Sequence, residues 1–135
     1  WQLAKNTSFN FQGVYGKGIS NYIQDLSGTG LDLVPSETDD SRLKAFNAWG
    51  GFAGFTHQWN EKLSSNIMYS YARVLEQYGM PSTSYKYAQY AAANLFWDFS
   101  EYGSCGIEYV YGRRNDFNKE YGNANRINTM IQYRF

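Results

Sequence analysis

The sequence predicts an all-β protein, an antiparallel transmembrane β-barrel, with these 135 residues supplying about six C-terminal strands of a larger barrel. Three observations support this fold class. Aromatic residues make up 19% of the chain, and there are 13 Gly but only 2 Pro, a composition that favours strands. Apolar and polar residues alternate over several segments, as they do in a strand with two unlike faces. Connections between these segments alternate between short and long, which is typical of outer-membrane barrels.

The first half of the chain contains three predicted strands. Thr7 to Gly16 places aromatic residues at most odd positions and the amide residues Asn10 and Gln12 at even ones. Ala45 to Trp59 is rich in glycine, and Asn66 to Val74 alternates large apolar residues with small or polar ones. A long connection, Lys17 to Lys44, separates the first two strands, whereas a short turn around Asn60 to Leu63 joins the second to the third.

The second half contains the other three. Tyr85 to Phe99 includes three consecutive alanines that a helix would also accept, but the surrounding Tyr, Phe and Trp favour a strand. Ser104 to Arg113 is the fifth strand, and the polar stretch Arg114 to Asn123 then predicts a loop. Asn125 to Phe135 alternates over its whole length and ends on an aromatic residue, as the last strand of an outer-membrane barrel does.

Composition excludes several other classes of protein. Lysine plus arginine and aspartate plus glutamate both number 12, so the chain lacks the basic excess of a nucleic-acid-binding protein. A single cysteine, Cys105, excludes an internal disulfide and a cysteine-based zinc site. The longest uncharged run, Ala45 to Asn60, contains glycine and polar residues and is too short and polar for a transmembrane helix.

Six strands are too few for a closed barrel. Single-chain barrels have at least eight strands, and an open sheet would leave unpaired backbone groups in lipid. The chain also begins at Trp1 without an initiator Met or a signal peptide. We therefore expect residues 1–135 to be the C-terminal portion of a single barrel domain whose N-terminal part is missing.

Several segments resemble the family of DcaP-like porins. They are Glu108 to Arg114, Ala124 to Ile127, Gln132 to Phe135, Tyr15 to Ile19 and Tyr69 to Tyr71. The resemblance implies a homotrimer in the bacterial outer membrane that takes up small hydrophilic solutes passively. These solutes are often anionic, as dicarboxylates are, and the resemblance implies no cofactor. The partners would then be outer-membrane lipid and the solute. The chain differs from the family because much of such a porin is absent from it: it has no N-terminal periplasmic segment and too few strands.

Polar residues near the end of the chain are candidates for lining the pore. A basic ladder on the polar face of the last strand would attract anions, and Glu108 would point inward and pair with a neighbouring arginine. Two further arginines open the predicted last loop, where they would steer anions toward the mouth. The alternative is that these side chains only solvate the lumen or a loop. The candidates are Arg126, Asn128, Gln132, Arg134, Glu108, Arg113 and Arg114.

The opposite face of the last two strands is predicted to contact lipid. It carries Ile107, Tyr109, Tyr111, Ile127, Ile131 and Tyr133. Aromatic residues also gather near strand ends, at Trp49, Trp59 and Trp97 among others, which is typical of the aromatic girdles at the two membrane interfaces.

An enzyme and a soluble binding protein are the alternatives. The only histidine, His57, has no second histidine for a metal site, and Trp59 stands where a barrel phospholipase would need its serine. We therefore expect no catalytic residues and no bound metal. A small soluble β-barrel or sandwich that binds an apolar ligand stays open, because alternation alone does not say which face is inside. In that protein Ile127, Ile131 and Tyr133 would face a core.

Overall fold

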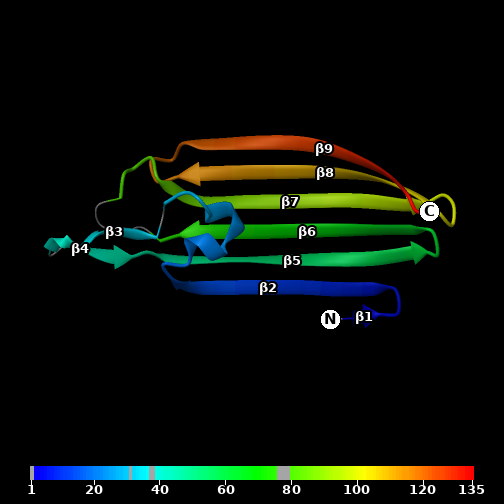
Figure 1. The fold of residues 1–135 in the computed structure, drawn as a ribbon, viewed down its shortest axis with the longest axis horizontal. Coiled ribbons are helices and arrows are strands. Elements are labelled where there is room, and N and C mark those ends of the chain that lie inside the picture. Colours follow the sequence, from blue (N-terminus) through cyan, green and yellow to red (C-terminus); the bar gives the residue numbers. More distant parts are fainter. Residues whose placement is uncertain (1, 31, 37–38, 76–79) are drawn as a thin grey trace.

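Seven antiparallel strands form one sheet in the computed structural model, which describes residues 2–30, 32–36, 39–75 and 80–135 (Figure 1). The strand order is β1-β2-β5-β6-β7-β8-β9, so from β5 onward each strand pairs with the next one in the chain. A second, two-stranded sheet joins β3 to β4. The elements are β1 Gln2–Ala4, β2 Thr7–Lys17, η1 Ser20–Tyr22, η2 Gln24–Leu26, β3 Leu33–Ser36, β4 Asp39–Ala45, β5 Asn47–Asn60, β6 Leu63–Val74, β7 Tyr85–Asp98, β8 Gly103–Asp116 and β9 Tyr121–Tyr133.

All six strands predicted from the sequence are present, as β2 and β5 to β9. The three alanines 91–93 lie within β7 and pair with Tyr69, Met68 and Ile67 of β6, so this segment is a strand rather than a helix. The short edge strand β1 and the β3–β4 hairpin were not predicted. None of the described residues belongs to a helix with the length and apolarity needed to cross a membrane.

The connection between β8 and β9 is shorter than the sequence predicted. Gly122 and its neighbouring asparagines are turn signals, yet Asn123 pairs with Arg113 and Gly122 pairs with Arg114 in the ladder. Cross-strand pairing extends both strands, and only residues 117–120 connect them. The predicted loop Arg114 to Asn123 is therefore mostly strand.

The connections sort to the two ends of the sheet. Residues 5–6, 61–62 and 99–102 lie at one end with the C-terminus, which we call the short-turn end. The strand pairs β2 and β5, β6 and β7, and β8 and β9 are joined at the other end, the long-loop end, at the left of Figure 1. The predicted sorting of connections to opposite ends is confirmed, although the last one is short.

Strand register divides the side chains between two faces. One face, which we call the aromatic face, includes a cross-strand row in which Phe55, Ile67, Ala93, Tyr109 and Ile127 are successive partners. Large apolar side chains stand exposed on it, among them Ile67 at 63% and Ile127 at 69%. The register places the six residues predicted to contact lipid on this one face: Ile107, Tyr109, Tyr111, Ile127, Ile131 and Tyr133.

The long connection after β2 folds back over the opposite face, which we call the loop-bearing face (Figure 1). Gly18 turns the chain with a positive φ of 63° and donates its backbone N–H to the carbonyl of Phe46. Asp32 then holds the connection together, because its carboxylate accepts from the Ser20 backbone N–H at 2.9 Å and from the Asn21 amide at 3.1 Å. These bonds hold the short helix η1 in place above the sheet, and η2 follows it along the chain.

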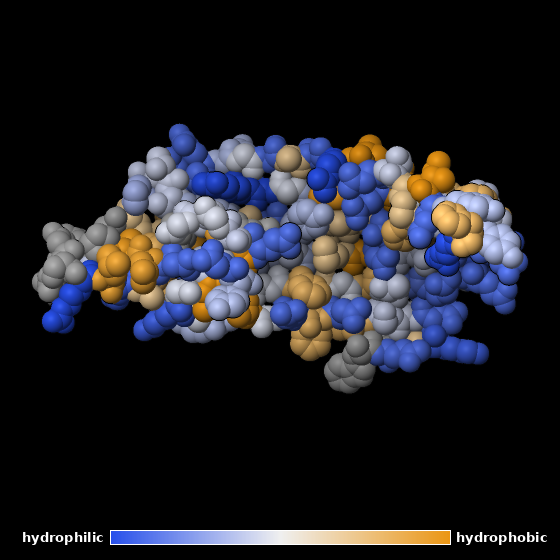
Figure 2. Space-filling view, viewed as in Figure 1, coloured by the Kyte–Doolittle hydropathy of each residue, from blue (hydrophilic) through white to orange (hydrophobic). Residues whose placement is uncertain are grey.

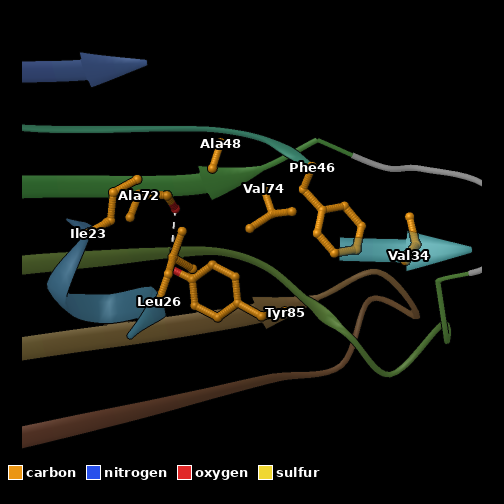
Figure 3. Packing of buried hydrophobic residues seen from close by; sticks show 8 residues of the cluster. All are labelled: Ile23, Leu26, Val34, Phe46, Ala48, Ala72, Val74 and Tyr85. Atoms are coloured by element: carbon orange, nitrogen blue, oxygen red, sulfur yellow. Dashed lines mark hydrogen bonds between the residues drawn. The ribbon is translucent and has the colours of Figure 1, made fainter. Parts of the chain in front are cut away.

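A small apolar core pins these helices to the loop-bearing face (Figure 3). Leu26 is fully buried, and it lies with Ile23 among the sheet residues Ala72, Val74 and Tyr85. The sheet leaves room because its residues here are small: a Cβ on Gly50 would come within 3.4 Å of the Ile23 side chain. Burying a leucine or isoleucine contributes about 1.5–3 kcal/mol, which partly offsets the conformational entropy lost when the long connection is ordered against the sheet.

Candidate functional site

A row of polar side chains crosses the loop-bearing face, where hydrophilic residues predominate (Figure 2). Thr56 donates to the Asn66 amide oxygen, and the Asn66 amide nitrogen donates to the Asn94 oxygen at 2.8 Å. The Asn94 amide nitrogen lies 3.5 Å from the Glu108 carboxylate, which also accepts from Asn128 at 2.9 Å. These five residues are successive cross-strand partners from β5 to β9, and we call them the polar row.

Glu108 has amide partners instead of the arginine partner that the sequence predicted. Both of its carboxylate oxygens accept from asparagine side chains, and within the described part of the chain no arginine forms an ion pair with it. The asparagine donors stabilise the carboxylate without adding positive charge. Asn94 was not singled out from the sequence, because its face in β7 follows only from the register.

Removing the carboxylate tests the polar row. We expect Glu108→Leu to lower the free energy of unfolding by about 1–2 kcal/mol, because the two asparagine amides lose their acceptor. Glu108→Gln keeps an acceptor oxygen and should lower it by less than about 1 kcal/mol. Urea unfolding of the full-length protein in lipid vesicles measures both values. Equal losses for the two variants would show that the amide bonds contribute nothing.

Arg126 lies on the same face, one row from Asn128 toward the long-loop end. It lines a hollow of about 650 Å³ between the sheet and the short helices, together with Tyr22 and Gln24 from the long connection and Ser70 from β6. Among the described residues no carboxylate forms an ion pair with Arg126. Its positive charge is therefore presented to the hollow.

Arg114 shares this face, but a carboxylate partly neutralises its charge. Its Nε donates to Asp116 at 2.8 Å, and its guanidinium lies 5.5 Å from the centre of the Tyr85 ring. Gln132 pairs with Ser104 on the same face, near the short-turn end. Register therefore places Glu108, Arg114, Arg126, Asn128 and Gln132 on one surface.

Arg113 and Arg134 are not part of that group. Side chains alternate along a strand, so Arg113 lies on the aromatic face opposite Asn123 and beside Gln89. Arg134 follows the end of β9 at the short-turn end, where its backbone N–H donates to the Tyr102 carbonyl. It lines a separate hollow with the acidic residues Glu61, Asp98 and Glu101.

His57 is also on the aromatic face. Its Nδ1 is 2.8 Å from the Thr7 hydroxyl, and the Trp59 ring meets it edge-on with a centroid distance of 4.5 Å. Within the described residues no three His, Cys, Asp or Glu side chains gather as a metal site would require.

Comparison with known proteins identifies the family and the fold to which this sheet belongs. The model of the family described as DcaP outer membrane protein matches residues 8–135. The chain belongs to the DcaP outer membrane protein family. The crystal structure of the outer membrane channel DcaP of Acinetobacter baumannii has the same fold, with a TM-score of 0.81 at 18% sequence identity. That match covers 100% of this chain and 38% of the channel's length. No curated protein matches the chain.

Family membership places the protein in the bacterial outer membrane and makes the sheet part of an antiparallel transmembrane β-barrel. Family membership excludes the soluble alternative, which put Ile127, Ile131 and Tyr133 in a core. Because a transmembrane barrel turns its apolar face outward, we expect these side chains to contact lipid.

The spacing of aromatic residues agrees with this membrane setting. Trp49 and Trp59 on β5 are ten residues apart, as are Tyr87 and Trp97 on β7. Ten residues extend about 33 Å along a strand, and a tilt of about 40° reduces this to about 25 Å across the membrane, the height of the apolar band of such barrels. The side chains therefore fit two aromatic girdles.

Proposed function

We propose that the full-length protein is an outer-membrane porin through which small hydrophilic solutes diffuse passively, and that residues 1–135 are one portion of its single barrel domain. The long connection carries this proposal, because it packs against the polar face of the sheet rather than extending away from it. A barrel whose inner wall is the loop-bearing face would be narrowed there, and the hollow of about 650 Å³ would be part of its passage.

The charge at the hollow supports a preference for anions, including dicarboxylates, because Arg126 is the one charged residue among the described residues that line it. Asparagine amides surround the one carboxylate of the polar row, Glu108, whereas the Arg126 guanidinium faces the hollow. A fixed cation in a narrow aqueous passage raises the local concentration of anions. The proposed lining is Glu108, Arg114, Arg126, Asn128 and Gln132, with Arg134 at the rim. Arg113 is left out because it lies on the aromatic face.

Passive diffusion requires no catalytic group or cofactor, and we propose that the protein is not an enzyme. In this arrangement the short-turn end faces the periplasm and the long-loop end faces outward, as in other outer-membrane barrels. The homotrimer implied by the resemblance belongs to the same proposal, and light scattering of the full-length protein in detergent measures it.

Solute flux tests the proposed function. The full-length protein, reconstituted in lipid vesicles, is compared with empty vesicles in osmotic swelling with succinate and with 1,4-diaminobutane, which have the same chain length and opposite charge. We expect both solutes to enter faster than in empty vesicles, and succinate to enter faster than the diamine. Flux no greater than in empty vesicles would contradict the porin proposal, whereas equal rates for the two solutes would contradict only the anion preference.

A further inference from the structure

Charge on the aromatic face is confined to one end and has one sign. Among the described residues of the seven-stranded sheet, its charged members are Lys17, Arg73 and Arg113. All three lie in the last rows before the long-loop end. The carboxylates of the same strands, such as Glu108 and Asp116, belong to the loop-bearing face. Within the described strands of this sheet, the aromatic face is therefore cationic at the long-loop end and uncharged elsewhere.

Arg73 is held among aromatic rings. Its cross-strand partners are Trp49 on β5 and Tyr87 on β7. The Tyr71 ring stacks on both, with centroid distances of 5.0 Å to Trp49 and 5.5 Å to Tyr87. The Nε atom of Arg73 is buried and has no hydrogen-bond partner. The rings fix the stem of this arginine and leave its positive charge without a carboxylate.

Arg113 is held in a similar way two strands along. Its guanidinium carbon lies 4.5 Å from the centre of the Tyr121 ring, and its Nε donates to Asn115 at 3.0 Å. Asn115 in turn pairs with Tyr87, so the two arginines border one aromatic cluster. Within the described chain neither has an ion-pair partner.

We propose that this arginine–tyrosine patch, formed by Arg73, Arg113, Tyr71, Tyr87 and Tyr121, binds the anionic phosphate head group of a lipid in the leaflet at the long-loop end. Trp49 and Tyr87 belong to the girdle at that end, which places both guanidinium groups at head-group depth rather than among acyl chains. Guanidinium groups bind phosphate oxygens through paired N–H donors. An anionic head group supplies the charge that the face itself lacks.

Lipid retention tests the patch. The full-length protein is stripped of lipid in detergent and incubated with equal amounts of phosphatidylglycerol and phosphatidylcholine, and native mass spectrometry counts the lipids that stay bound. We expect the wild-type protein to retain phosphatidylglycerol in preference to phosphatidylcholine. The double variant R73Q/R113Q should retain at least fivefold less phosphatidylglycerol, whereas Lys62→Gln, which removes a cation from the turn at the other end, should match the wild type.

Two results would overturn the proposal. The wild type would show no preference between the two lipids, or the double variant would retain phosphatidylglycerol as the wild type does. If the double variant also changed its oligomeric mass in the second case, the patch would be assigned to contact with a neighbouring protein. The conductance of the double variant is measured as a control, and an unchanged conductance would show that the barrel is intact. If that variant does not fold, the single variant Arg113→Gln is measured, with a reduced retention of phosphatidylglycerol expected.

Discussion

Ile127→Arg is expected to lower the free energy of unfolding of the full-length protein in lipid vesicles by about 2–4 kcal/mol. Ile127 is 69% exposed on the aromatic face. On β9 it lies midway between the aromatic residues Tyr121 and Tyr133, so its side chain is near the middle of the membrane. An arginine there would place a charge among acyl chains, far from either interface.

Two other positions on β9 provide controls for this loss, which urea unfolding measures. Ile131 is only two residues from Tyr133, so Ile131→Arg should lower the free energy of unfolding by about 1 kcal/mol, the value near an interface. Met130 is apolar but lies on the loop-bearing face opposite Gly106, so Met130→Arg should have little effect. A loss for Met130→Arg as large as that for Ile127→Arg would show that the two faces have been assigned the wrong way round.

Arg126→Glu is expected to shift the channel from anion preference toward cation preference. The substitution reverses one charge that lines the hollow beside Tyr22 and Gln24. At about 8 Å in water, a reversal of one charge changes the energy of a passing ion by about 1 kcal/mol, with opposite signs for an anion and a cation, or about 30-fold in their permeability ratio. The reversal potential in a planar bilayer under a salt gradient measures this ratio. The shift should shrink above about 0.1 M salt, where the screening length is about 10 Å.

Arg114→Glu is the matched control for this measurement. Arg114 lies on the same face, but its ion pair with Asp116 and its 54% exposed side chain reduce its field in the passage. We therefore expect a smaller shift in reversal potential than for Arg126→Glu. An equal or larger shift in reversal potential for Arg114→Glu would show that the narrow part of the passage does not lie at Arg126. No shift for either variant would contradict the anion preference.

Alternation in the sequence predicted which residues share a face, because side-chain direction in a strand depends only on the parity of position. That is why Ile127 and Ile131 lie together, and why Arg126 and Asn128 lie together on the other face. The parity argument was not applied to Arg113 and Arg114, because they stand where the predicted fifth strand ends and were predicted to open a loop. In the structure this stretch continues the ladder, and the two neighbouring arginines point to opposite faces.

The inward position of the long connection could not be predicted from local pattern. Residues 20–26 form two short 3-10 helices without a regular hydrophobic period. Their position depends on distant partners, since Ile23 and Leu26 pack against sheet residues such as Ala72 and Val74. The hydrogen bonds of Glu108 could not be predicted from the sequence for the same reason. They depend on the register that places Asn94 and Asn128 on either side of Glu108.

The polar row also bears on how the barrel reaches its native pairing. A slip of one residue between strands turns the apolar side chains to the wrong face, so lipid itself opposes such an error. A slip of two residues keeps every side chain on its own face, and alternation offers no protection against it. In that misaligned ladder Glu108 would stand opposite Ala92 or Phe96 instead of Asn94, and its carboxylate would lose that amide donor. The row of Thr, Asn and Glu therefore selects the correct alignment from those that the hydrophobic pattern cannot tell apart.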